Sequence, residues 1–123
     1  APIVEANGGG SIVNMLTLIA LGSLPAMGGY SASKAAALSM TQALRAQLTG
    51  RGITIHGVFP GAVDTDMIRA VEMPKTPAAD VATAVLDGVE KGIEDIFPDA
   101  MSQGMGAIWL RDPKAFERQI AAL

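Results

Sequence analysis

The stretch YSASKAAALSMTQALRAQLTGRGITIHGVFPG, residues 30–61, carries the pattern that decides the fold. Its first part is rich in alanine and repeats apolar side chains at helical spacing, which predicts a long helix over about residues 29–49. Glycines at positions 50 and 52 end that helix. The apolar run Ile53–Phe59 then predicts a buried strand that stops at Pro60. A long helix is therefore followed directly by a short buried strand.

The rest of the chain repeats this alternation of strand and helix. We expect a strand at Ser11–Leu16, a helix at Ala78–Gly92, a third brief strand within residues 94–99, an amphipathic stretch at Met101–Leu110 and a last helix from Asp112. The strands are continuous apolar runs, which is typical of a parallel sheet covered by helices on both faces. The sequence thus predicts an α/β fold, a doubly wound parallel sheet of three strands with covering helices.

Composition narrows the class of protein. The 123 residues suffice for one domain, and half of them are hydrophobic, so we expect a packed core. A net charge of −3 without a basic cluster argues against nucleic acid as a partner. The chain has no cysteine, which excludes thiolate metal sites and fits a cytoplasmic location. The most apolar stretch, residues 15–27, is too short to span a membrane and contains Pro25.

Three segments with reactive groups come together in this topology, since ligands bind outside the carboxyl ends of the strands in such sheets. Thr17 follows the first strand, and PGAVDT, residues 60–65, follows the second. Tyr30 and Lys34 lie one helical turn apart and project from one face. A phenol is a poor acid–base group at neutral pH, but a nearby ammonium favours the phenolate. Such a phenol can pass a proton to or from an alcohol or carbonyl oxygen, while the Thr17 hydroxyl holds that oxygen.

In three motifs, GGGSIVN (residues 8–14), YSASK (residues 30–34) and PGAVDT, the chain resembles the carboxyl-terminal half of the short-chain dehydrogenases/reductases. The resemblance implies a Rossmann-like fold and hydride transfer between an alcohol or carbonyl substrate and NAD or NADP. It implies that Tyr30 is the acid–base residue, that Lys34 holds the nicotinamide ribose, and that Thr17 stands at the family's serine position. It also implies that the nicotinamide end of the cofactor is contacted by Pro60, Gly61, Val63 and Thr65.

No segment of the chain reads as a strand, a glycine-rich phosphate loop and a helix in that order. We therefore expect residues 1–123 to be a single partial domain, with residues 1–7 as the tail of a preceding helix. The missing half then lies upstream, in a longer parent chain, or has been lost. We expect a homo-oligomer or pairing with that amino-terminal half. The alternative function is a truncated, non-catalytic domain that self-associates or pairs with another chain.

The remaining polar and apolar candidates have plainer explanations. His56 lies in the predicted buried strand and is the only histidine, so we expect a core or sheet-edge residue and no metal site. Asp64 and Asp66 could bind a cation, but capping of a short helix explains them better. Two explanations are equally open for a further group of apolar side chains: they form a lid over a substrate, or they take part in ordinary helix packing. The group consists of Met67, Ile68, Val71 and Met73.

Overall fold

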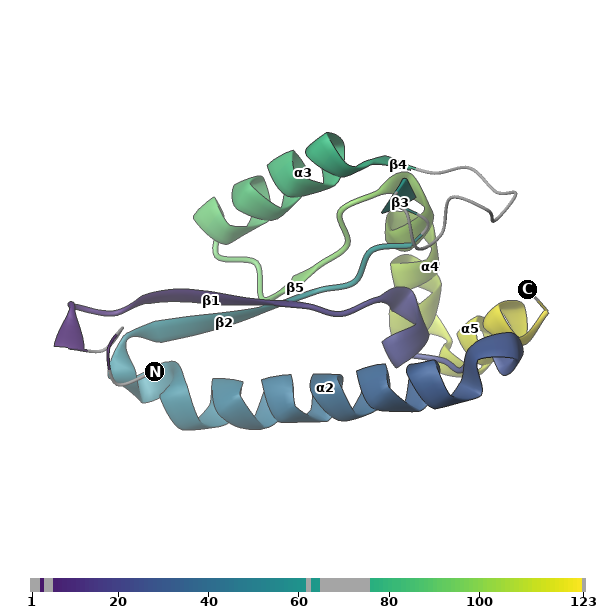
Figure 1. The fold of residues 1–123 in the computed structure, drawn as a ribbon, viewed down its shortest axis with the longest axis horizontal. Helices are drawn as coiled ribbons and strands as arrows, with labels where there is room; N and C mark the ends of the chain where they lie inside the picture. Colours follow the sequence, from purple (N-terminus) through teal and green to yellow (C-terminus); the bar gives the residue numbers. More distant parts are fainter. Residues whose placement is uncertain (1–2, 4–5, 62, 65–75, 123) are drawn as a thin grey trace.

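A computed structural model of the chain describes residues 3, 6–61, 63–64 and 76–122 (Figure 1). The helices with fully described bounds are α2 (Gly28–Leu48), α3 (Ala78–Glu90), α4 (Ala100–Arg111) and α5 (Pro113–Ala121). The strands are β1 (Gly10–Met15), β2 (Ile53–Val58), β3 (Val63–Asp64), β4 (Thr76–Pro77) and β5 (Asp95–Ile96). No helix in these described ranges is both long enough and apolar enough to cross a bilayer.

The central sheet has the parallel order β1-β2-β5 among the described residues, as the sequence predicts. Gly10 pairs with Ile53 and Met15 with Val58, so β1 and β2 run in register over their whole lengths. On the other side of β2, Gly57 pairs with Asp95. The middle strand β2 is almost wholly buried, which explains its continuous apolar run.

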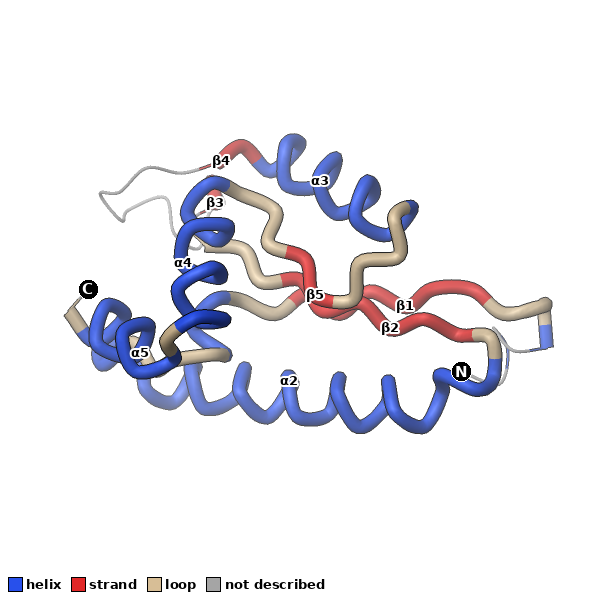
Figure 2. Tube along the Cα trace, turned by 180° about the vertical axis from the view of Figure 1, so that it is seen from behind, coloured by secondary structure: helices blue, strands red, loops and turns tan. Residues whose placement is uncertain are grey.

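Helices cover both faces of this sheet, as a doubly wound fold requires. Figures 1 and 2 show α2 along one face and α3 across the other. On the α2 side, the buried side chains of Leu48, Ile53 and Ile55 form one core cluster, which also includes Ile12 at its edge. The predicted α/β architecture is therefore confirmed for the described part of the chain.

A second and larger core cluster lies where β1 and β2 end and α4 and α5 pack beside them. Its buried members come from three parts of the chain: Leu16, Leu18, Phe59, Phe116 and Ile120. Met101, Met105 and Trp109 of α4 are partly buried and pack against it, which fits the amphipathic stretch predicted for this segment. Helix α5 begins as predicted, with Asp112 as its cap and Pro113 in its first turn.

The carboxyl-terminal end of α2 is fixed relative to the sheet by a tight turn at Gly52 and by the side chain of Arg45. Gly52 has a φ of 73°, a left-handed conformation that suits glycine, and it turns the chain from α2 into β2. The Arg45 side chain donates to the Ile55 carbonyl at 3.2 Å and reaches the Asp95 carboxylate at 3.0 Å. Because Ile55 lies on β2 and Asp95 on β5, one guanidinium joins the helix to two strands.

His56 is fully buried in β2, so its expected place in the core is confirmed. Its Nδ1 contacts the carbonyl oxygen of Ile93, in the connection between α3 and β5.

Upstream, the Asn7 amide donates to the Ile3 carbonyl at 3.2 Å, a helical turn that fits the expected helix tail.

Asp64 is the one residue of the expected capping segment 64–67 that the structure describes. It lies in β3, which pairs in parallel with β4. Strand β4, at residues 76–77, falls in a segment for which the sequence predicted no regular element. A two-residue ladder has no periodicity to detect, because pairing with a distant segment forms it. The expected helix beyond Asp64, together with Asp66 and the four residues of the proposed lid, lies outside the described residues.

Candidate active site

The segments with reactive groups meet at one end of the molecule. Strands β1 and β2 run toward that end, and α2 begins there and runs back in the opposite direction (Figures 1 and 2). Helix α4 packs on the same end. The loop after β1, the start of α2 and the loop after β2 therefore surround the carboxyl ends of the strands, where doubly wound sheets bind their ligands.

Tyr30 and Lys34 share one face of the first turns of α2, as their spacing predicts. The Lys34 Nζ lies 5.6 Å from the centre of the Tyr30 ring, within the range of a cation–π contact. Tyr30 is 37% exposed as a residue, so a ligand can reach it. Lys34 Nζ also lies 3.5 Å from the Met15 carbonyl oxygen, at the limit of a hydrogen bond. The pair thus sits against the end of β1.

Thr17 caps the short 3-10 turn Leu18–Ala20 that follows β1. Its Oγ1 accepts a hydrogen bond from the Ile19 amide at 3.4 Å. A hydroxyl that accepts one bond still has its own proton to donate. The side chain is partly exposed, so that proton can reach an oxygen atom of a ligand. The capping bond is long, and it leaves the hydroxyl free to adjust.

The loops after β1 and β2 are held together beyond the ends of the strands. The Leu16 amide donates to the Val58 carbonyl at 2.7 Å, and the Leu18 amide donates to the Pro60 carbonyl at 3.1 Å. These bonds continue the parallel ladder on both sides of Thr17. Thr17 and Pro60, which are 43 positions apart in the chain, are therefore brought together by the backbone.

Gly61 lies beside the first turn of α4. Its amide donates to Asp99 Oδ1 at 2.9 Å. A Cβ atom on Gly61 would lie only 2.9 Å from Asp99 Oδ2 and 3.0 Å from Met101 Sδ, so any other residue here would force these side chains to shift. Two further residues were predicted to contact the cofactor. Val63 is the first residue of β3, and Thr65 lies outside the described residues.

Sequence reasoning missed two polar residues that fix the position of α2. Asn14 of β1 donates through Nδ2 to the Thr41 hydroxyl at 3.0 Å, and Thr41 in turn donates to the Ala37 carbonyl at 2.8 Å. Thr41 is 1% exposed. Asn14 stands in the quoted motif GGGSIVN, and a polar residue within an apolar strand was the available signal. The bond sets the register of the helix that carries Tyr30.

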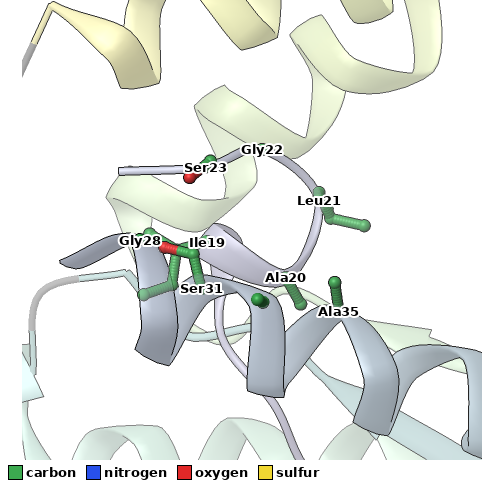
Figure 3. A pocket seen from close by; sticks show the side chains of 9 residues that line it. Ile19, Ala20, Leu21, Gly22, Ser23, Gly28, Ser31 and Ala35 are labelled. Atoms are coloured by element: carbon green, nitrogen blue, oxygen red, sulfur yellow. The ribbon is translucent and has the colours of Figure 1, made fainter. Parts of the chain in front are cut away.

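Ser31 was missed as well. It is the residue after Tyr30, it is 2% exposed, and its hydroxyl accepts a hydrogen bond from the Leu24 amide at 3.2 Å. It also lines a cavity of about 300 Å³ between the loop after β1 and the first turns of α2 (Figure 3). Thr17, Tyr30 and Lys34 do not line this cavity, so it is distinct from the Tyr–Lys face.

No cluster of three or more potential metal ligands occurs within the described ranges. The reactive groups at the site are instead a phenol, an ammonium and a hydroxyl on neighbouring segments. This set can donate and accept protons and can hold the oxygen of a small molecule.

Comparison with known proteins gives a consistent result. A family model for short chain dehydrogenases matches residues 1–75. A short-chain type dehydrogenase/reductase of Picea abies is 37% identical over 95 residues, which are 77% of this chain and 35% of that protein. The 7alpha-hydroxysteroid dehydrogenase of Escherichia coli K12 is 35% identical over 75 residues, which are 61% of this chain and 29% of that enzyme.

A solved structure shows the same fold. It is a short chain dehydrogenase from Burkholderia cenocepacia J2315, crystallised in complex with NADP. Superposition gives a TM-score of 0.88 at 37% sequence identity and covers 97% of this chain. The chain spans 50% of that structure, and so corresponds to half of it. On the family model, the relatives and the fold together, this chain belongs to the short-chain dehydrogenase family.

Proposed function

We propose that the protein containing this chain is an NAD(P)-dependent oxidoreductase that interconverts an alcohol and a carbonyl, with Tyr30 as the acid–base residue. The observation that carries this proposal is that the Lys34 ammonium lies over the Tyr30 ring and 3.5 Å from the carbonyl oxygen of Met15, the last residue of β1. Family membership supports the reaction class. Residues 1–123 form a single partial domain in this proposal, because they match half of the solved relative.

The donors present fit the ribose of a nicotinamide cofactor. The Lys34 ammonium has three N–H donors, and one of them points toward the Met15 carbonyl at 3.5 Å. Its other donors remain available for ribose hydroxyl groups. Pro60 and Gly61 adjoin this face through the backbone bond to Leu18, and we propose that they, with Val63 and Thr65, contact the nicotinamide end.

When bound, the nicotinamide supplies or accepts the hydride at the substrate carbon. In the reducing direction, the Tyr30 phenol transfers its proton to the substrate oxygen as the carbon–oxygen double bond becomes an alcohol. Lys34 stabilises the phenolate that remains. The Thr17 hydroxyl donates a hydrogen bond to the same oxygen and keeps it within reach of the phenol. In the oxidising direction the phenolate removes the alcohol proton.

A direct test follows the hydride. The full-length protein is incubated with NADH or NADPH deuterated at the nicotinamide C4 and with a panel of aliphatic, cyclic and steroid ketones. Product mass is then measured. We expect one deuterium on the carbon of the new alcohol, and about 10²-fold or more slower formation of that labelled alcohol after Tyr30→Phe. Absence of labelled alcohol across the panel with both cofactors would contradict the proposed function.

The alternative, a non-catalytic domain that self-associates or pairs with another chain, is favoured by a separate observation. Strand β1 forms one edge of the described sheet, and on it Val13 is 38% and Met15 52% exposed. On the outer side of α2, Met40 is 61% exposed. Exposed apolar side chains on a sheet edge favour association. A folded, stable oligomer that binds no nicotinamide cofactor would support this alternative.

A further inference from the structure

Asp99 makes two kinds of hydrogen bond from one buried carboxylate. Its Oδ2 accepts the Ser102 amide at 3.1 Å and so caps α4, while its Oδ1 accepts the Gly61 amide at 2.9 Å. The residue is 3% exposed. Ser102 completes a capping box, because its hydroxyl accepts from the Asp99 amide at 3.1 Å. One carboxylate thus joins the start of α4 to the loop after β2.

Capping alone does not require this arrangement. Asp112 caps α5 in the same way, through the Ala115 amide at 3.1 Å, with an exposed side chain. A serine or threonine cap would serve either helix, since a single oxygen atom satisfies the orphan amide. At Asp99 the second oxygen reaches a residue 38 positions away and is buried there. Burial of a carboxylate is costly unless both oxygens are hydrogen-bonded, as they are here.

The segment Pro60–Gly61 is consequently held from two sides. On one side the Pro60 carbonyl accepts the Leu18 amide, next to Thr17. On the other side Asp99 accepts the Gly61 amide, and the contact is so close that a Cβ at Gly61 would displace the Asp99 or Met101 side chain. The Gly61 N–H is therefore used inside the protein and does not point to a ligand. What this segment offers a cofactor is its fixed position.

We propose that Asp99 is a positioning residue for the nicotinamide-binding loop, a role that rests on the proposed function. It sets the place of Pro60–Gly61 and, through the Leu18–Pro60 bond, the distance of that loop from Thr17. Asp99 touches neither cofactor nor substrate in this role. Its loss should therefore act on cofactor affinity and turnover through the loop, and a misplacement of about 1 Å can cost as much as ~10²-fold in rate.

The test separates capping from positioning. Asp99→Ser retains a capping oxygen for α4 but is too short to reach Gly61 as well. We expect a lower melting temperature, because the Gly61 amide loses its charged acceptor, together with at least tenfold lower kcat/KM, an increased KM for the cofactor, and faster hydrogen exchange of the Gly61 amide. Asp112→Ser is the matched control, since it makes the same change at the cap of α5. It should leave all three measurements near their natural values.

Two further variants keep the proposal testable. Ser102→Ala removes the reciprocal half of the capping box and leaves the Asp99–Gly61 bond, so it should lower stability without accelerating exchange at Gly61. If the serine variant does not fold, Asp99→Asn keeps the shape of the side chain with one acceptor oxygen. Across these variants, Gly61 exchange and cofactor KM should change together. Faster exchange at Gly61 with unchanged kcat/KM would overturn the positioning role.

The two readouts also separate this inference from the proposed function. Hydrogen exchange at Gly61 reports the anchor whether or not the protein transfers hydride. If the natural protein gives no labelled alcohol, the proposed function fails, and the exchange result then describes a structural anchor only. If the natural protein is active and Asp99→Ser retains its kcat/KM, the inference alone fails.

Discussion

The ammonium group of Lys34 lies over the face of the Tyr30 ring, 5.6 Å from its centre, at the start of α2. The ring itself makes this contact, so Tyr30→Phe preserves the cation–π geometry and removes only the hydroxyl. We predict that this variant loses about 10²-fold or more in turnover, the usual scale for a positioned acid–base group. Cofactor affinity and melting temperature should change little. Near-normal steady-state turnover of the phenylalanine variant would remove Tyr30 from the proposed chemistry.

Thr17 gives a second prediction, because its hydroxyl is proposed to hold the reacting oxygen. Thr17→Ala should lower turnover, whereas Thr17→Ser should retain it or increase it, since loss of the γ-methyl frees χ1. The serine variant also keeps the capping bond to Ile19, so it controls for local unfolding of the turn. The measurement compares steady-state turnover of the three proteins at saturating cofactor. Equal turnover with threonine, serine and alanine at position 17 would count against this role.

Arg45 should matter for stability, since its guanidinium bonds to the Ile55 carbonyl on β2 and to the Glu94 carbonyl just before β5, while only 18% of its side chain is exposed. We predict that Arg45→Met lowers the free energy of unfolding by about 1–3 kcal/mol, because the carbonyl of the buried residue Ile55 loses a charged donor. Arg118→Met on the exposed surface of α5 is the matched control and should have little effect. Urea unfolding monitored by circular dichroism compares the two, and equal midpoints would refute the prediction.

One glycine that contacts the start of α4 and one glycine within α4 should respond oppositely to alanine. Gly61→Ala places a methyl group 2.9 Å from Asp99 Oδ2, so we predict a loss of about 1–3 kcal/mol in stability. Gly104 lies within α4 with nothing within 4 Å of its Cβ position. Gly104→Ala should therefore stabilise the protein by roughly 0.5–1 kcal/mol through helix propensity. Thermal unfolding of both variants is the measurement, and shifts in the same direction would contradict it.

Residues 1–123 prepared alone should associate and should not bind NADH or NADPH in the micromolar range. The edge strand β1 exposes Val13 and Met15, and the sequence contains no glycine-rich phosphate loop. Sedimentation together with cofactor fluorescence titration tests both parts of this prediction. A monodisperse monomer that binds a nicotinamide cofactor tightly would disprove it.

The sequence predicted the sheet and the site to different extents, for physical reasons. Strands β1 and β2 and helix α2 were predictable because burial on fixed faces imposes a periodic pattern on their residues. Tyr30 and Lys34 were predicted on one face because helix geometry alone sets their relation. The short ladder of β3 and β4 was missed, because two residues carry no periodicity.

The polar contacts that hold the site in place could not be predicted from the sequence, for a different reason. Asp99 was predicted only as the end of the third strand segment, and its bond to Gly61 joins positions 38 residues apart. The same holds for Arg45, whose partners Glu94 and Asp95, just before and on β5, are 49 and 50 positions away. Local patterns report local structure, whereas these polar side chains find their partners only after the sheet has formed. The DAMS stretch at 99–102 could have been suspected as a helix cap from its pattern, whereas the burial of Asp99 has no local signal, since Asp112 caps α5 with an exposed side chain.

Because α2 is long, a small change of its tilt at Arg45 produces a larger displacement of the Tyr30 hydroxyl at the site. At 1.5 Å of rise per residue, Arg45 lies about 22 Å along the helix axis from Tyr30. A helix is stiff over such a length, so a tilt of about 3° at the Arg45 end would move the phenol by about 1 Å, a displacement that can cost ~10²-fold in rate. Substitutions at the base of the helix, far from any ligand, can therefore tune catalysis without altering a single group at the site.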